Sequence, residues 1–171
     1  MKKTIIACIA AMLLAIPATT IGKGKASKST TLEVSFNYQR QQGPGSNQYA
    51  VWIEDEKGEV VKTLFVTSFT TKGRARGNEP LVRGYVKRPA CVPAWVKAVK
   101  ANDLSDQQGK AVKDGTYRVM VEATLFNAST ITYSGTFSTL DKAGNITLTS
   151  QLTQPDEKHK EMVTEVKARL K

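Results

Sequence analysis

Basic side chains are concentrated in one stretch of this 171-residue chain. Between Phe69 and Ala101 the sequence has eight Lys or Arg residues and one acidic residue, Glu79. Clustered cations attract phosphates, carboxylates, acidic glycans and lipid headgroups, and a guanidinium group can bind two oxygens at once. A well-solvated basic insertion with no partner is the alternative interpretation. The sequence predicts a site for an anionic ligand or partner, with charge and contact area from Arg74, Arg76, Arg83, Tyr85, Lys87, Arg88 and Trp95.

Cys91 and His159 are the side chains that a nucleophilic or redox reaction would use. Lys87 and Arg88 would lower the pKa of the Cys91 thiol if they approached its sulfur, which makes Cys91 a candidate redox residue. A buried, inert thiol is the alternative. His159 lies in a run of charged residues, where no third group would hold the imidazole as a catalytic site requires. We therefore predict no catalytic residue and no enzymatic activity.

The first 22 residues have the order of a secretory signal: two lysines, then an apolar run, then small residues. The run from Ile5 to Ile16 has 12 apolar residues, whereas a membrane-spanning helix needs about 20. We predict cleavage between Ala18 and Ala26 and a mature chain, 23–171, with no transmembrane segment. The predicted location is the periplasm, with the cell surface as the alternative, and no nucleic-acid partner is expected there.

Removal of the signal leaves Cys91 as the one cysteine, so no intramolecular disulfide can form and the fold must rest on its apolar core. Zinc and iron–sulfur sites need several Cys or His ligands, so we expect no bound metal. The length of the mature chain suits one domain with its own core.

Alternation of apolar and polar residues predicts a series of β-strands. Leu32, Val34, Phe36 and Tyr38 alternate with polar residues, as in a strand with one buried face. The turn sequences Asp55 to Gly58 and Asp114–Gly115 separate such segments, because Gly accepts the positive φ of tight turns. Seven strands without a βαβ alternation indicate an all-β fold, an antiparallel β-sandwich. The expected strands cover 32–38, 49–54, 60–67, 116–126, 131–140, 146–152 and 162–170.

Two segments of this pattern are less regular. The C-terminal residues Met162, Val166 and Leu170 also fit a helix at steps of four, but the alternation through the whole segment favours a strand. Residues 69–101 lose the period of two, and we expect this basic insertion to contain two short helices beginning at Pro80 and Pro93. An insertion of this length in a compact domain is more often functional than idle.

Several motifs resemble known families. The segments Val51 to Leu64 and Asp103 to Val121 resemble the immunoglobulin-like domain of flagellar hook-capping proteins, with an Asp-x-x-Gly turn followed by an Asp-Gly-x-Tyr hairpin. The chain is more broadly similar to a family of predicted periplasmic bacterial proteins of unknown function built on the same plan. The residues that carry this similarity are Asn47 to Asp55, Lys62 to Leu64, Pro93 to Trp95 and Asp114 to Tyr117.

The resemblance implies a role beside membrane redox systems with covalently attached flavin. Many relatives carry an Asp-x-x-(Ser/Thr)-Gly-Ala-Thr segment before the second hairpin, but this chain lacks it after Trp95, so no residue is predicted to attach flavin. We predict an exported, non-enzymatic binding or accessory module of the bacterial envelope that recognises an anionic ligand through its basic insertion. The alternatives are an accessory of a flavin or redox system, using Cys91 or noncovalent flavin, and a purely structural envelope component.

Overall fold

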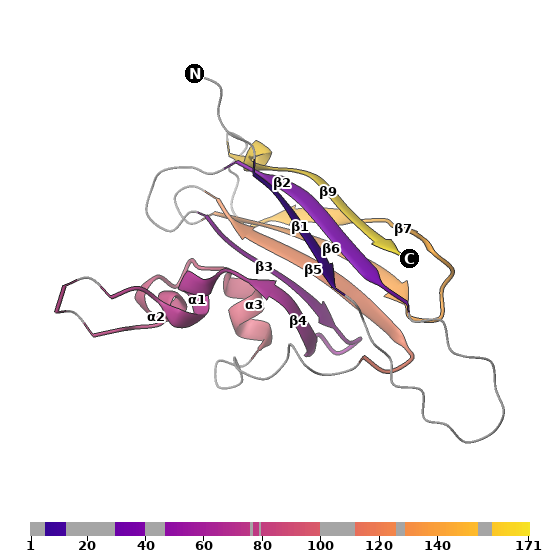
Figure 1. The fold of residues 1–171 in the computed structure, drawn as a ribbon, viewed down its shortest axis with the longest axis horizontal. Helices are drawn as coiled ribbons and strands as arrows, with labels where there is room; N and C mark the ends of the chain where they lie inside the picture. Colours follow the sequence, from indigo (N-terminus) through magenta and orange to yellow (C-terminus); the bar gives the residue numbers. More distant parts are fainter. Residues whose placement is uncertain are drawn as a thin grey trace.

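The protein is an antiparallel β-sandwich, and its described residues include three short α-helices on one side. The computed structural model describes residues 6–12, 30–39, 47–75, 77–78, 80–99, 112–125, 129–153 and 159–171. One sheet has the strand order β1-β2-β9-β7 and the other the order β4-β3-β5-β6-β8, with antiparallel pairing throughout. Figure 1 shows the two sheets lying face to face. The strands are β1 (Ile6–Met12), β2 (Leu32–Tyr38), β3 (Gln48–Glu54), β4 (Val60–Val66), β5 (Thr116–Thr124), β6 (Thr130–Ser138), β7 (Gly144–Ile146), β8 (Thr149–Leu152) and β9 (Val163–Leu170).

The main core lies between the two sheets. Strand β2 shows the expected alternation, because Leu32, Val34, Phe36 and Tyr38 are buried and the residues between them are partly exposed. From the opposite sheet, Val51 and the inward side chains of β5 and β6 complete this core. Apolar side chains buried in this way supply the main stabilisation of a fold that has no disulfide among its described residues.

The strands agree closely with the sequence predictions in most places. Strand β3 has buried residues on both faces and lies between β4 and β5, as its doubly apolar centre indicates. The C-terminal segment is a strand, β9, preceded by one turn of 3-10 helix at Lys160–Met162. Both results confirm the expectations drawn from residue alternation. The strand expected from 116 to 126 is described as far as Thr124; Phe126 lies outside the described residues.

The predicted strand 146–152 is wrong, because the chain there divides between the two sheets. Strand β7 pairs with β9 in one sheet, and β8 pairs with β6 in the other. The chain passes tightly over Gly135 of β6, where an added Cβ would lie 2.5 Å from the carbonyl oxygen of Thr147. Because Thr147 and Leu148 make the crossing between sheets, they belong to neither strand.

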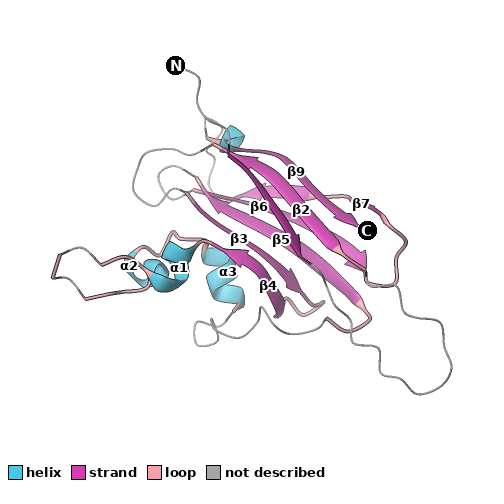
Figure 2. Cartoon of the chain, viewed as in Figure 1, coloured by secondary structure: helices cyan, strands magenta, loops and turns pink. Residues whose placement is uncertain are grey.

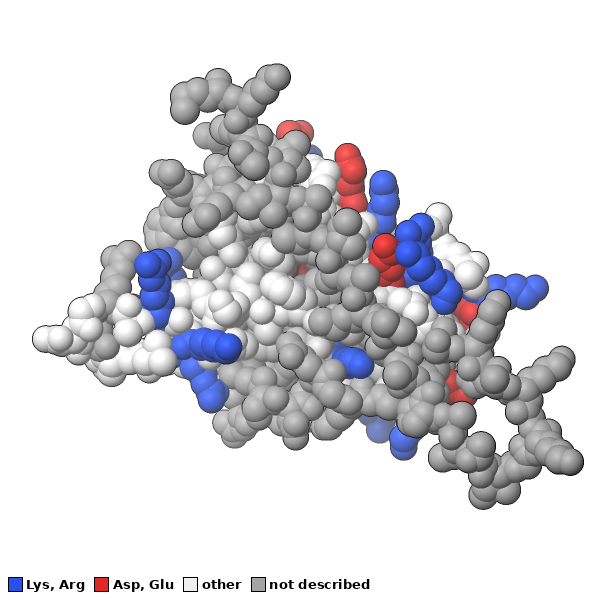
Figure 3. Space-filling model, viewed as in Figure 1, with Lys and Arg blue, Asp and Glu red and all other residues white. Residues whose placement is uncertain are grey.

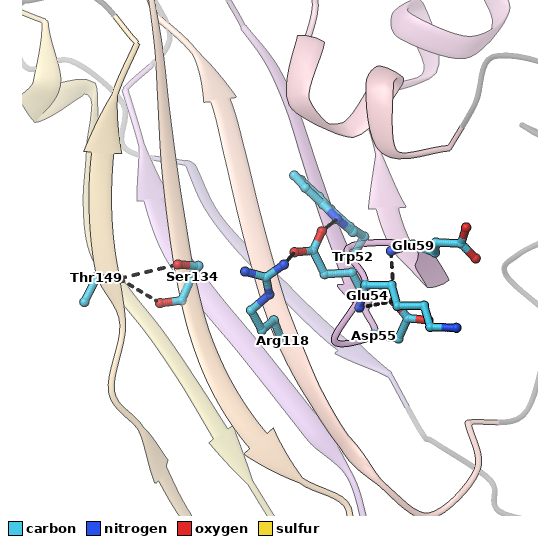
Figure 4. Close-up of polar contacts among 8 residues, drawn as sticks. Trp52, Glu54, Asp55, Glu59, Arg118, Ser134 and Thr149 are labelled. Atoms are coloured by element: carbon cyan, nitrogen blue, oxygen red, sulfur yellow. Dashed lines mark hydrogen bonds and ion pairs between the residues drawn. The ribbon is translucent and has the colours of Figure 1, made fainter.

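The hairpin between β3 and β4 forms the turn that its sequence predicts. Asp55 Oδ1 accepts hydrogen bonds from the backbone N–H groups of Lys57 and Glu59, both at 2.9 Å, and Gly58 adopts a φ of 79°. Beside this turn the buried Glu54 accepts a hydrogen bond from Trp52 Nε1 at 3.1 Å and pairs with Arg118 Nη2 at 2.6 Å. Figure 4 shows both groups of contacts, which fix β3 against β4 and β5.

At the far edge of the same sheet, Thr149 on β8 contacts Ser134 on β6. The Thr149 hydroxyl donates to the Ser134 carbonyl oxygen at 3.4 Å and also lies 3.4 Å from the Ser134 hydroxyl (Figure 4). These contacts are exposed, so they assist the backbone pairing of an edge strand without forming a site.

The described part of the insertion between β4 and β5 contains three helices: α1 (Ser68–Lys72), α2 (Gly84–Lys87) and α3 (Pro93–Ala98). Figure 2 shows them together on one side of the molecule, next to β3 and β4. Pro93 occupies the first turn of α3 as predicted. The helix expected at Pro80 is wrong: α2 begins only at Gly84, because the preceding Arg83 has an extended backbone. Among the described residues, no helix has the length and apolar character to cross a membrane.

Candidate anion-binding lobe

The first part of the insertion forms a small basic lobe, defined here as α1, α2 and the segment between them through Arg88 (residues 68–88). Helices α1 and α2 contact each other. Of the predicted ligand-binding residues, Arg74, Arg83, Lys87 and Arg88 are exposed on this lobe and Tyr85 is partly exposed, while Arg76 lies outside the described residues. Figure 3 shows Lys and Arg side chains around this end of the molecule, with no described Asp or Glu side chain visible beside them in that view.

The arginines of the basic lobe contact aromatic groups. Arg83 Nη1 donates to the Tyr85 hydroxyl at 3.5 Å, and the Arg88 guanidinium lies 5.7 Å from the centre of the Phe69 ring. Within the described ranges, no carboxylate lies within ion-pair distance of Arg74, Arg83 or Arg88. Their positive charges are therefore not neutralised by a described neighbour, and an external anion can approach them.

Charged residues on the β2–β9 pair behave differently. Glu33 forms ion pairs with Arg169 and with Lys171, whose Nζ lies 2.8 Å from Glu33 Oε2. Hydrogen bonds from these two cations hold the pKa of the Glu33 carboxyl at about 2. Figure 3 shows blue and red side chains intermixed toward the end of the molecule opposite the basic lobe.

Two glycines close the base of the basic lobe. Gly73 has a φ of 73°, and an added Cβ there would lie 1.8 Å from the Val82 carbonyl oxygen. At Gly84 an added Cβ would lie 2.1 Å from the Phe69 carbonyl oxygen. Because real Cβ atoms do not approach oxygens so closely, these positions require glycine, and the two ends of the segment between α1 and α2 are pressed together.

The basic lobe is also fixed to the sandwich through β3. The hydroxyl groups of Thr67 and Thr70 both donate to Gln48 Oε1, at 2.6 and 3.1 Å. Thr70 is fully buried. Helix α1 therefore starts from a fixed position on the sheet, which presents the cations of the lobe in a defined direction.

The second part of the insertion, residues 89–99, packs on the outer face of the five-stranded sheet. Here Trp95 joins Val92 and Val99 in a second core with Ala50 and Trp52 of β3. Trp95 is 1% exposed, and its Nε1 donates to Thr63 Oγ1 at 3.1 Å. The prediction that Trp95 offers contact area to a ligand is therefore wrong, because this side chain fills the space between α3 and the sheet.

Cys91 lies in the same packed region. Its side chain is fully buried, and this burial raises the pKa of the thiol, although the nearby Arg88 acts in the opposite direction. Of the two interpretations left open by the sequence, the geometry favours the inert thiol, because a reactive cysteine needs an accessible, easily ionised sulfur.

Glu122 of β5 is the polar residue that the sequence analysis missed. It is fully buried and accepts hydrogen bonds from the backbone N–H groups of Ala94 and Trp95 at 3.0 and 2.9 Å. These N–H groups belong to the first turn of α3, where no intrahelical partner exists. Burial raises the pKa of the Glu122 carboxyl to about 7, and the two backbone hydrogen bonds oppose this rise.

Thr124, two residues further along β5, holds the segment before α3. Its hydroxyl donates to the Ala90 carbonyl oxygen at 2.8 Å and accepts from the Val92 N–H at 3.1 Å. Val92 has a left-handed backbone with φ of 40°, which is unfavourable for a β-branched residue and is held by these contacts. The only sequence signal for these two anchors was an acidic and a hydroxyl residue within an apolar strand.

The other described surfaces include a pocket and a histidine. A pocket of about 390 Å³ lies near β7, lined by Asp141, Lys142 and neighbouring backbone and apolar groups. Among the residues that the structure describes, no group of His, Cys, Asp and Glu side chains could hold a metal ion. His159 directly precedes the 3-10 helix at Lys160–Met162.

Comparison with protein-family models, with curated proteins and with solved structures found no match to this chain.

Proposed function

We propose that the protein is an exported, non-enzymatic binding module of the bacterial envelope that recognises an anionic ligand through the basic lobe. In this proposal the sandwich, with an immunoglobulin-like plan, is the scaffold, and Arg74, Arg83, Lys87 and Arg88 supply the positive field. Tyr85 supplies contact area beside Arg83. The proposed location is the periplasm, after removal of residues 1–22.

One observation carries the proposal: exposed arginines of the basic lobe have no carboxylate partner among the described residues, whereas Glu33 is paired with two cations. Exposed charges of one sign placed together create a local potential that attracts counter-ions. The lobe is closed at Gly73 and Gly84 and hydrogen-bonded to β3 through Gln48, which supports a fixed recognition surface.

The redox alternative is less well supported by these contacts. A redox role for Cys91 would require access to its sulfur, yet the side chain is fully buried and the pKa of its thiol is raised. A purely structural role gives no reason for several exposed guanidinium groups on one lobe that have no carboxylate partner among the described residues.

The test is to neutralise Arg74 and Arg83 by substitution with Gln and to measure binding of inositol hexakisphosphate by calorimetry. Each exposed substitution should change the unfolding free energy by no more than about 0.5 kcal/mol. Binding should weaken at least about tenfold and should depend less steeply on salt, because two screened attractions are gone while those of the remaining cations persist. The matched control neutralises Lys142 and Lys167, which are exposed on other parts of the sandwich.

This control removes the same net charge, so it separates a local site from a general effect of a basic protein. If the control pair weakens polyanion binding as much as the arginine pair, or if neither pair changes it, the basic lobe is not the site.

A further inference from the structure

Two large apolar side chains are exposed on the same lobe as the arginines. Leu81 is 66% exposed and Val86 is 57% exposed. Only one other large apolar residue among those described, Leu140, is comparably exposed, and it lies in the turn after β6. Exposed apolar side chains are common singly, but two of them beside a basic surface match a partner that is both apolar and anionic.

Leu81 and Val86 alternate with cations along the chain. Arg83 lies between them, and Lys87 and Arg88 follow directly. Leu81 and Val86 are five positions apart, so their Cα atoms lie within about 18 Å of each other even for an extended chain. Tyr85 lies in the same segment and has an apolar ring with a polar hydroxyl group. It is partly exposed and accepts a hydrogen bond from Arg83.

We propose that the basic lobe docks on the surface of a bilayer with anionic headgroups, with Leu81 and Val86 entering the boundary between headgroups and acyl chains. This inference rests on the proposed function and names the source of the anion. The cations contact lipid phosphates, while the two apolar side chains leave water. A residue such as Tyr85 suits that boundary, where one end of the side chain is apolar and the other is hydrated.

A bilayer accounts for the lobe better than a soluble anion does. A soluble phosphate compound would pair with the arginines but would leave Leu81 and Val86 in water. A bilayer offers both environments within a few ångströms, and basic residues next to apolar anchors are the composition typical of peripheral membrane attachment. The base of the lobe is closed at Gly73 and Gly84, so the segment that carries both side chains is already folded before binding.

The experiment measures co-flotation of the protein, purified after expression of its complete sequence, with phosphatidylethanolamine vesicles that contain or lack phosphatidylglycerol. We expect binding to the anionic vesicles only. Substituting Leu81→Ser together with Val86→Ser should weaken that binding about tenfold or more. The reason is that the variant lacks the two apolar side chains whose transfer from water to the bilayer is favourable. The same variant should bind inositol hexakisphosphate as well as the parent does.

Leu140→Ser is the matched control, because it removes a similarly exposed apolar side chain from a different surface. It should leave vesicle binding unchanged. A second measurement places a reporter in the lobe: the emission of a Leu81→Trp variant should shift to shorter wavelength when anionic vesicles are added, and that of Leu140→Trp should not.

Three outcomes separate the two proposals. If the Leu81→Ser/Val86→Ser variant binds vesicles as tightly as the parent protein, insertion into the bilayer is overturned. The same conclusion follows if the Leu81→Trp variant binds vesicles and its emission does not shift. If the protein does not bind vesicles but still binds inositol hexakisphosphate in a salt-sensitive way, insertion into the bilayer is also overturned, while the proposed function stands. Polyanion binding that does not depend on Arg74 and Arg83 overturns the proposed function itself.

Discussion

Residues 89–99 and the basic lobe belong to the same insertion but relate to the sandwich in opposite ways. In the first region, Glu122 and Thr124 bind backbone groups before and within α3, and Trp95 is buried against β3 and β4. In the second, the exposed side chains include cations and apolar residues, and the contacts at the base fix the lobe. One basic stretch of sequence can therefore contain both a part that packs into the structure and a part whose side chains are exposed to a possible partner.

The largest effect should come from Trp95. We expect Trp95→Ala to lower the unfolding free energy by about 3–5 kcal/mol, because it leaves a cavity in the second core and removes the partner of Thr63. Urea denaturation followed by circular dichroism measures this change. Leu81→Ala, a truncation on the exposed side, should stay within about 0.5 kcal/mol. Similar losses for both variants would remove the distinction between the two regions.

The next effect is a dependence of stability on pH through Glu122. Its pKa of about 7 in the folded protein lies above the value of 4.5 for an unperturbed carboxyl, so the folded state holds this proton more tightly. The contribution of Glu122 to the unfolding free energy is fully present below pH 4.5. It declines as the pH rises toward 7 and is lost above pH 7. The unfolding free energy should fall by about 3 kcal/mol in total, because each unit of pKa difference between the folded and unfolded states corresponds to about 1.36 kcal/mol.

Glu122→Gln should abolish this decline, as measured by urea denaturation at pH 5 and pH 8. The carboxyl of Glu33 acts in a separate range, because its lowered pKa gives stability above pH 4.5 that is lost toward pH 2. An unchanged slope between pH 5 and pH 8 in the Glu122→Gln variant would show that another group titrates there.

The smallest effect should come from Gly84. Gly84→Ala places a Cβ against the Phe69 carbonyl oxygen, a backbone atom that cannot move aside as a flexible side chain can, and should destabilise the protein by about 1–3 kcal/mol, the range for overpacking. Hydrogen exchange should show faster opening of α1 and α2 with little change in β5. Equal acceleration in β5 would mean that the lobe and the sandwich open as one unit.

Much of the fold was predictable from local patterns. The alternation in β2 and the turn at Asp55 depend on residues close in sequence, so single segments carry their signal. The division between β7 and β8 was not predictable, because it depends on the crossing over Gly135, a residue of another strand.

The candidate site was predictable only in part. Exposed cations such as Arg74 and Arg83 follow from the composition of the insertion, but the burial of Trp95 and Glu122 does not. A glutamate in an alternating strand reads as solvent-facing unless another element covers that face. Here α3 covers it, and the packing of α3 on β5 is a contact between segments about 28 residues apart.

Strand β1 gives one more consequence. It pairs along the whole outer border of β2, from Ile6 opposite Tyr38 to Met12 opposite Leu32, and it lies inside the segment expected to be cut off during export. A chain shortened in that way has β2 as its outermost strand, with main-chain donors and acceptors open to water. Edge strands of this kind can pair with a strand from another polypeptide, so removal of residues 1–22 would change which strand borders this sheet.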